Sequence, residues 1–196
     1  MAYPSRKRKG LKTKKSVLIV CEGTHTEGGY FEKIRQLLRK PNVNVHVYGE
    51  GKSQMALLDA VDGRAKTKSK EITSAWVVFD KDNLAREEIE KTYKFATRRN
   101  VNIGFTNICF ELWLLLHFES IKGGPLDKNQ LYRKLERHLQ TDNYEKSKGN
   151  WDLIEKVAVN FRTAVKHNKK LLKQQNDKFT NPFSNIHEII EEIESL

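Results

Sequence analysis

Short apolar segments alternate with longer segments of helical spacing over residues 16–107, and this alternation constrains the fold most strongly. Four segments rich in Val, Ile and aromatic residues predict β-strands: SVLIVCEG (16–23), VNVHVYG (43–49), SAWVVFD (74–80) and VNIGFTN (101–107). The segments between them have the apolar spacing of helices: 26–40, 53–70 and 83–100. Strands joined by helices of this length are parallel, with right-handed crossovers. The order therefore predicts an α/β fold, a doubly wound sheet of about four parallel strands flanked by helices.

Composition divides the chain into three parts. Residues 1–14 are basic and show no apolar periodicity, which predicts a disordered basic arm. Residues 15–122 hold the α/β domain. Residues 123–196 begin with a Gly-Gly-Pro break and form a helical C-terminal part packed on the same core. In this last part the apolar spacing predicts helices over about 128–139, 150–175 and 183–195.

The charge of the chain points to a polyanionic partner. The sequence contains 36 Lys and Arg residues against 25 Asp and Glu, a formal net charge of +11 at pH 7. Basic residues gather in four clusters, at 5–15, 64–70, 98–100 and 166–173. Such a surface favours nucleic acid first and an anionic membrane surface second. The N-terminal arm is either a nucleic-acid contact or a solubility tail.

The cysteines and the apolar runs indicate a cytoplasmic protein. Cys21 and Cys109 lie in apolar runs and are expected to be buried free thiols, which suits a reducing cytosol. No apolar run is long enough to span a membrane. The basic N-terminus lacks the hydrophobic region of a secretory signal. We therefore expect no membrane association.

Acidic residues follow two of the predicted strands at the point where each strand ends. Glu22 closes the first strand with Glu27 in the loop beyond it, and Asp80 and Asp82 close the third strand. In an open parallel sheet, ligands bind beyond the carboxyl ends of the strands. If the first and third strands are neighbours, Glu22, Asp80 and Asp82 converge at one edge. The alternative is that the third strand ends in water and its two aspartates form a surface turn.

A site built from carboxylates suits a hard divalent cation. Oxygen ligands without a paired cysteine or histidine favour Mg²⁺ or Mn²⁺ over Zn²⁺. Such an ion would offset the repulsion between Glu22, Asp80 and Asp82, clamp a phosphate and stabilise the charge that develops in phosphodiester cleavage. A carboxylate that the metal does not fully use could transfer a proton.

Two ionisable residues interrupt the apolar segment NICFELWLLLHFE (107–119), which is expected to be largely buried. A buried Glu111 needs a partner, which could be a metal, a backbone donor or a basic side chain. It either faces the acidic strand ends or neutralises a neighbour. His117 is either a core histidine with satisfied hydrogen bonds or a functional group. Asn83 and Asn107 are expected to cap the helices that follow them.

Four segments resemble the RloB family, a relative of the Toprim fold found in topoisomerases, primases and nucleases associated with OLD-type ATPases. They are VLIVCEGTHTEGGYF (17–31), VVFDKDN (77–83), TNICFELWLLLHFE (106–119) and TNPFSNIHEIIEEI (180–193). The resemblance implies a Toprim-like sheet, with Glu22 as general acid/base and Asp80 and Asp82 as metal ligands. Glu27 fits the Thr-Glu pair of the family. The resemblance also implies a place in bacterial or archaeal defence loci, beside an ABC- or OLD-type ATPase. One difference is Ile108, where the family pattern has proline.

These features support two functions from different classes. The first is a Mg²⁺-dependent nuclease that acts on DNA or RNA in anti-phage defence with a partner ATPase. Its core would be Glu22, Asp80 and Asp82, with Glu27 and Glu111 assisting. The second is a non-catalytic nucleic-acid-binding or effector subunit of an ATPase-containing defence complex. A stripe of isoleucines in the last helix either docks such a partner or closes the core: Ile186, Ile189, Ile190 and Ile193.

Overall fold

The sheet positions everything else in the molecule. The computed structural model describes residues 15–40, 43–51, 53–67, 72–122, 124–175 and 177–196. The basic arm predicted over residues 1–14 lies outside the described residues. The sheet has the order β2-β1-β3-β4-β5. Its strands are β1 (Lys15–Cys21), β2 (Val43–Gly49), β3 (Ile72–Asp80), β4 (Asn102–Asn107) and β5 (Phe183–Ser184).

The first four strands are parallel, which confirms the α/β class and the predicted strand number for the parallel part. The fifth strand is an addition from the C-terminal part. It pairs antiparallel with β4 through Thr106 opposite Ser184 and Asn107 opposite Phe183. Periodicity could not predict it, because two residues are too few to show an alternation.

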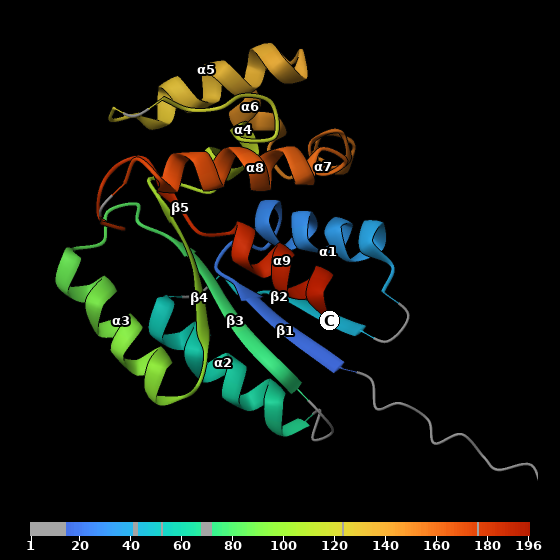
Figure 1. Ribbon diagram of the computed structural model, residues 1–196, viewed down its shortest axis with the longest axis vertical. Helices are drawn as coiled ribbons and strands as arrows, with labels where there is room; N and C mark the ends of the chain where they lie inside the picture. Colours follow the sequence, from blue (N-terminus) through green and yellow to red (C-terminus); the bar gives the residue numbers. More distant parts are fainter. Residues whose placement is uncertain (1–14, 41–42, 52, 68–71, 123, 176) are drawn as a thin grey trace, which may run out of the picture.

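Helices cover both faces of the sheet, as a doubly wound fold requires (Figure 1). Helices α1 (Thr26–Leu38) and α9 (His187–Ser195) lie on one face. Helices α2 (Gln54–Thr67) and α3 (Arg86–Arg98) lie on the other. The chain therefore changes face between its first and second crossovers, and β1 becomes the neighbour of β3.

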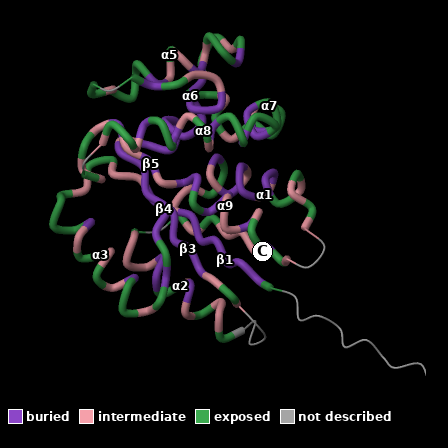
Figure 2. The backbone as a smooth tube through the Cα atoms, in the orientation of Figure 1, coloured by how far each residue is buried: buried purple, intermediate pink, exposed green. Residues whose placement is uncertain are grey.

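Burial on both faces explains why the strand sequences are continuously apolar. Along β1, Val17 and Ile19 belong to the apolar cluster on the α1 and α9 face, whereas Leu18 and Val20 belong to the cluster under α2 and α3. Residues of β1 are buried along nearly its whole length (Figure 2). Cys21 and Cys109 are buried free thiols, as predicted.

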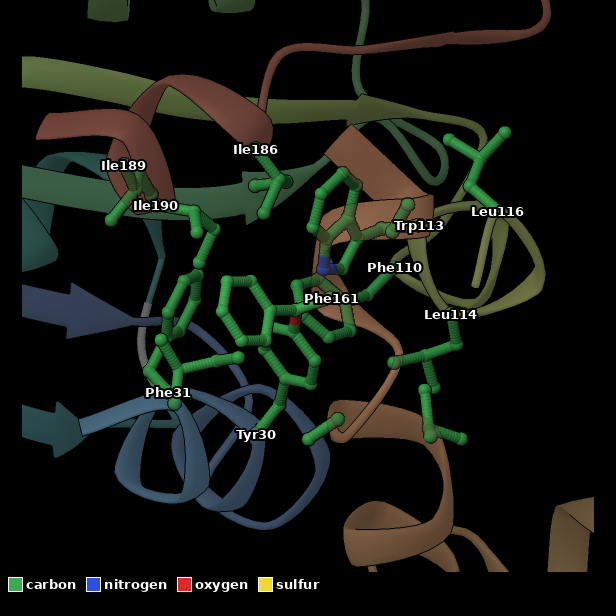
Figure 3. Packing of buried hydrophobic residues seen from close by; sticks show 14 of the residues in the cluster. Tyr30, Phe31, Phe110, Trp113, Leu114, Leu116, Phe161, Ile186, Ile189 and Ile190 are labelled. Carbon is green, nitrogen blue, oxygen red and sulfur yellow. The ribbon is translucent and has the colours of Figure 1, made fainter. Parts of the chain in front are cut away.

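The C-terminal part forms a layer of helices beyond α1 and α9 (Figure 1). It follows the short buried helix α4 (Glu111–Leu115) and contains α5 (Lys128–Leu139), α6 (Tyr144–Ser147), α7 (Trp151–Ala158) and α8 (Phe161–Leu172). The apolar cluster on the α1 face includes residues of α4, α5, α7, α8 and α9 together with β1. Figure 3 shows side chains of α1, α4, α8 and α9 meeting there.

The isoleucine stripe of the last helix closes the core. Ile186, Ile189 and Ile190 are fully buried, and Ile193 is 1% exposed. This supports the core interpretation over the docking interpretation, since a buried stripe is not free to bind a partner. Gly104 of β4 allows the close approach, because a Cβ at this position would lie 2.9 Å from Cδ1 of Ile189.

Several local expectations from the sequence were wrong. The helix expected over 183–195 begins at His187, and residues 183–184 form β5 instead. The helix expected over 150–175 is two helices, since α7 ends at Ala158 and α8 begins at Phe161. Helix α6 was not expected. Asn83 is not a cap, because α3 begins at Arg86 and Ala85 is its N-cap residue.

Among the described residues, no helix is long and apolar enough to cross a membrane.

His117 is a core histidine with satisfied hydrogen bonds. It is 2% exposed, and its Nδ1 lies 3.0 Å from the Trp113 carbonyl oxygen. A carbonyl only accepts, so Nδ1 carries the proton, and Nε2 accepts from the Tyr30 hydroxyl at 3.0 Å. Burial lowers the pKa of His117 to about 3, because the charged form would lose its hydration.

Candidate active site

Five carboxylates line one pocket at the carboxyl ends of β1 and β3. The pocket has a volume of about 340 Å³, and its acidic residues are Glu22, Glu27, Asp80, Asp82 and Glu111. The structure thus brings together all five residues that the sequence singled out. The pocket lies where an open α/β sheet binds its ligands, because the strand order reverses at the crevice between β1 and β3.

The loop after β1 places two of these acids. The backbone N–H of Glu22 donates to the Val78 carbonyl at 2.9 Å, which ties the end of β1 to β3. The half-buried carboxylate of Glu22 has Nε2 of Gln54 at 3.4 and 3.5 Å from its two oxygens. The Glu27 carboxylate folds back over Gly23, where a Cβ would stand 1.6 Å from Oε2. Gly23 therefore leaves the space that Glu27 occupies.

The end of β3 holds its two aspartates differently. Asp80 uses both carboxylate oxygens within the protein, because Oδ1 accepts from the Thr106 hydroxyl and Oδ2 accepts from the Phe110 N–H at 2.9 Å. Asp82 is exposed, has a φ of 37°, and binds Nζ of Lys128 through Oδ1 at 2.8 Å. The aspartates thus differ in accessibility: Asp80 is fixed in the floor, and Asp82 stands at the rim.

Glu111 reaches the pocket from the first turn of α4. It is 5% exposed, and the thiol of Cys109 is hydrogen-bonded to it. It faces the acidic strand ends, which is the first of the two alternatives for this residue. The adjacent Asn107 does not cap α4, because its Nδ2 donates to the Phe179 carbonyl at 2.9 Å. The peptide bond between Asn107 and Ile108 is cis.

Burial and mutual repulsion raise the pKa values of these acids. Burial, followed by repulsion from Glu111 and Glu22, raises the pKa of Glu27 to about 7. Burial and the charge of Glu27 hold the pKa of Asp80 well above its usual range. Burial also raises the pKa of Glu22. The pocket therefore holds its negative charges against an electrostatic penalty that a bound cation would relieve.

The donor chemistry fits Mg²⁺ or Mn²⁺, although the side chains do not form a closed cage. Among the residues that the structure describes, no three acidic, histidine or cysteine side chains are placed to enclose a metal ion. Mg²⁺ does not require such a cage, because it keeps several waters and binds proteins through one or two carboxylates. Glu22 and Asp82 are the accessible pair, since the oxygens of Asp80 already accept from Thr106 and Phe110.

Two lysines and a tyrosine of the C-terminal part were missed by sequence reasoning. Lys128, Tyr132 and Lys148 line the pocket opposite the strand ends. Lys148 lies over the Tyr132 ring, with Nζ 5.9 Å from its centroid. No local motif marks these residues, and only the packing of α5 and α6 brings them to the pocket. His25, in the loop after β1, also lines the pocket.

Comparison with known proteins gives one result. The family model described as RloB-like protein matches residues 17–193 of the 196-residue chain. This range includes every residue of the acidic pocket. Comparisons with curated proteins and with solved structures gave no match.

Proposed function

This chain belongs to the RloB-like protein family, and we propose that it is a divalent-metal-dependent nuclease that hydrolyses phosphodiester bonds of DNA or RNA. One observation carries the proposal: five carboxylates from three separate segments meet in one pocket of a chain whose net charge is +11. The basic chain attracts a polyanion, yet the pocket repels a phosphate. A divalent cation between the acids and the phosphate resolves this conflict.

The chemistry divides among the residues by their accessibility. Glu22 and Asp82, the accessible pair, would hold Mg²⁺ or Mn²⁺ with Asp80 behind them, and the ion when bound would neutralise charge on the phosphate. Glu22 also serves as the general acid/base that the family resemblance implies. Glu27 transfers a proton at neutral pH, because its pKa of about 7 leaves both forms populated. Glu111 assists by keeping the pKa of Glu27 high.

The family resemblance extends the proposal beyond the pocket. We propose that the sheet is Toprim-like, since its acidic residues follow the strands that carry the Toprim signature, VLIVCEG and VVFDKDN. We also propose that the protein acts in the cytoplasm in anti-phage defence together with an ABC- or OLD-type ATPase. Support for this context is the similarity of the four sequence segments, and the direct check is co-purification with the product of a neighbouring ATPase gene.

A second function has one observation in its favour. Asp80 accepts hydrogen bonds from Thr106 and Phe110, and Asp82 forms an ion pair with Lys128, so both aspartates have partners within the protein. Such a self-contained network would also suit a non-catalytic nucleic-acid-binding or effector subunit of an ATPase complex. The two functions differ in whether a metal binds at Glu22.

The test compares Glu22→Gln with Glu87→Gln, a matched change on the exposed surface of α3. Each full-length protein is incubated with plasmid DNA and, separately, with total tRNA in Mg²⁺, Mn²⁺ or EDTA. We expect cleavage that requires the metal and is lost only in Glu22→Gln. Mn²⁺ binding is measured in parallel by electron paramagnetic resonance, since it does not depend on activation by a partner. Tight nucleic-acid binding with no cleavage and no loss of Mn²⁺ affinity in Glu22→Gln would establish the binding subunit instead.

A further inference from the structure

Helix α5 leads away from the acidic pocket along a row of three hollows. The first is the acidic pocket itself, which Lys128 and Tyr132 line. The second, of about 330 Å³, shares Tyr132 with the first. The third, of about 860 Å³, shares Arg133 and Glu136 with the second. Helix α5 lies at the outside of the helical layer, away from the sheet (Figure 1).

Two arginines of this row carry charges that no acid neutralises. Arg133 and Arg137 are exposed and lie one helical turn apart, and neither has a carboxylate partner among the described residues. The Nε of Arg137 donates only to the Arg133 carbonyl at 3.4 Å. Five other arginines are paired with acids, namely Arg35 with Glu32, Arg64 with Glu50, Arg86 with Glu90, Arg99 with Asp59 and Arg162 with Glu194, whereas Arg39 and Arg98 also have no carboxylate partner among the described residues. The guanidinium groups on α5 thus remain available to an external anion.

The acids of the row do not pair with these arginines. Glu136 stands between the second and third hollows, and its Oε1 accepts from the N–H of Tyr144 at 3.0 Å. Asp142 and Glu145 are exposed at the margins of the hollows. These three acids reduce the positive potential of the row. Replacing an arginine of the row should therefore weaken nucleic-acid binding, whereas replacing one of its acids should strengthen it.

We infer that this row is the track for the phosphodiester backbone of the nucleic-acid strand that flanks the bond cleaved in the acidic pocket. The inference rests on the proposed function and assigns the substrate path to the same site. Lys128 to Arg137 spans nine residues of helix, about 14 Å at 1.5 Å per residue. At the 3.4 Å axial rise per phosphate of one strand of B-DNA, that length corresponds to about four phosphates. Arg133 and Arg137 bind these phosphates, and Tyr132 offers its ring to a base at the pocket entrance.

The experiment measures binding without cleavage. Full-length protein in EDTA is titrated into fluorescein-labelled oligothymidylate and oligouridylate, and the Kd is read from anisotropy at several salt concentrations. We expect Arg133→Glu/Arg137→Glu to weaken binding by about tenfold or more. The slope of log Kd against log salt should fall by about 1.4, since each phosphate contact on a single strand contributes about 0.7. The tighter of the two oligonucleotides identifies DNA or RNA as the preferred strand.

Two further variants separate the track from a general charge effect. Arg98→Glu on α3 changes an arginine that also has no carboxylate partner among the described residues, on the opposite side of the sheet. It should alter the Kd by less than about twofold, although the change in net charge is the same per residue. Glu145→Lys should tighten binding by about twofold to threefold, because it adds a cation at the second hollow.

The outcomes distinguish this inference from the proposed function. If the wild-type protein binds neither oligonucleotide in EDTA, the track on α5 is wrong, because arginines bind phosphates without a metal, and cleavage of plasmid DNA or tRNA in Mg²⁺ tests the proposed function separately. If the wild-type protein binds and the double variant binds equally well, or if Arg98→Glu is equally damaging, the track on α5 is wrong and the nuclease proposal stands. Circular dichroism melting of every variant confirms that these exposed substitutions leave the fold intact.

Discussion

Gly23 leaves the space in which the Glu27 carboxylate lies, so one absent side chain shapes the acidic pocket. Gly23→Ala would place a methyl group on Oε2 of Glu27 and force that carboxylate away. We expect cleavage to fall to the level of Glu27→Gln, while stability changes by less than about 1 kcal/mol, or roughly 2–4 °C in Tm. A carboxylate that turns into the open pocket costs little stability, whereas a displaced proton-transfer group removes the chemistry.

Gly63→Ala is the control for this prediction. A Cβ at Gly63 meets nothing within 4 Å, and the residue lies inside α2. This substitution should raise stability by about 0.5–1 kcal/mol and leave cleavage unchanged. Cleavage assays and thermal melts compare the activity and the Tm of the two variants. Full cleavage by Gly23→Ala would mean that the position of the Glu27 carboxylate is unimportant.

Lys128 occupies the carboxylate oxygen that a metal ion would use at Asp82. Removing this competing cation in Lys128→Ala should tighten Mn²⁺ binding by about fivefold at most, the equivalent of an exposed ion pair. Mn²⁺ titration followed by electron paramagnetic resonance, in the absence of nucleic acid, measures the change. Lys94→Ala on the exposed surface of α3 is the matched control and should have no effect. Weaker Mn²⁺ binding by Lys128→Ala would show that Asp82 is not a ligand.

The predictability of single residues follows the range of their contacts. Glu22 and Asp80 were found from sequence because a strand end fixes the position of the next side chain. Lys128 and Lys148 were not found, because their positions depend on how distant helices pack. Asn107 was misjudged for the same reason, since its side chain bonds to Phe179, 72 residues away. A capping preference is local and weak, and a tertiary hydrogen bond overrides it.

Among the elements, the α4 region is sensitive to acid because His117 follows α4 within the core. The pKa of His117 is about 3 in the folded state, against about 6.5 for a histidine in the unfolded chain. Between these values only the unfolded state binds the proton. The free energy of unfolding should therefore fall as the pH drops from about 6.5 towards about 3. The contribution of His117 is roughly 5 kcal/mol at most over the whole window.

Urea unfolding of the wild type and His117→Gln between pH 7.5 and pH 4.5 measures this effect. The raised pKa values of Glu27 and Asp80 act in the opposite direction in both proteins, so the difference in slope isolates the histidine. We expect a shallower loss of stability with falling pH in His117→Gln. Parallel curves for the two proteins would show that His117 can be protonated in the folded state.

Element boundaries were less predictable than element types. The strands and the helices between them have strong periodicities, and the structure has them. The break between α7 and α8 at Val159 and Asn160 has no Gly or Pro to mark it. The apolar spacing resumes after the break, so the two helices read as one. Only the backbone conformation between Ala158 and Phe161 separates α7 from α8.

At the scale of the whole molecule, α9 is part of the structural core although it lies at the end of the sequence. Ile189→Ala removes a fully buried side chain that contacts Gly104 and should cost about 2–4 kcal/mol of stability. Leu37→Ala, at a position 38% exposed, should cost less than about 1 kcal/mol. Urea denaturation compares the two. Equal, small losses would mean that α9 is only loosely attached to the sheet.

The sequence predicted that β1 to β4 are parallel but not that β1 and β3 are adjacent. Apolar runs establish that strands exist, whereas their order depends on which crossover packs on which face. The convergence of Glu22 with Asp80 and Asp82 was therefore conditional until the order β2-β1-β3-β4-β5 was known. The Lys128, Tyr132 and Lys148 side of the pocket was beyond prediction, because it requires the placement of the whole C-terminal layer.

The apolar core on the α1 face contains residues of both the sheet and the C-terminal helices, and it determines when the pocket can be completed during synthesis. Its acids are translated first, its lysines follow from α5 and α6, and α9 emerges after every other described element. Domains fold as units once their core residues are present. A nascent chain therefore carries the carboxylates without their finished enclosure while the ribosome still holds the isoleucines of α9. The order of synthesis therefore postpones the completion of the pocket until the last helix of the core is available.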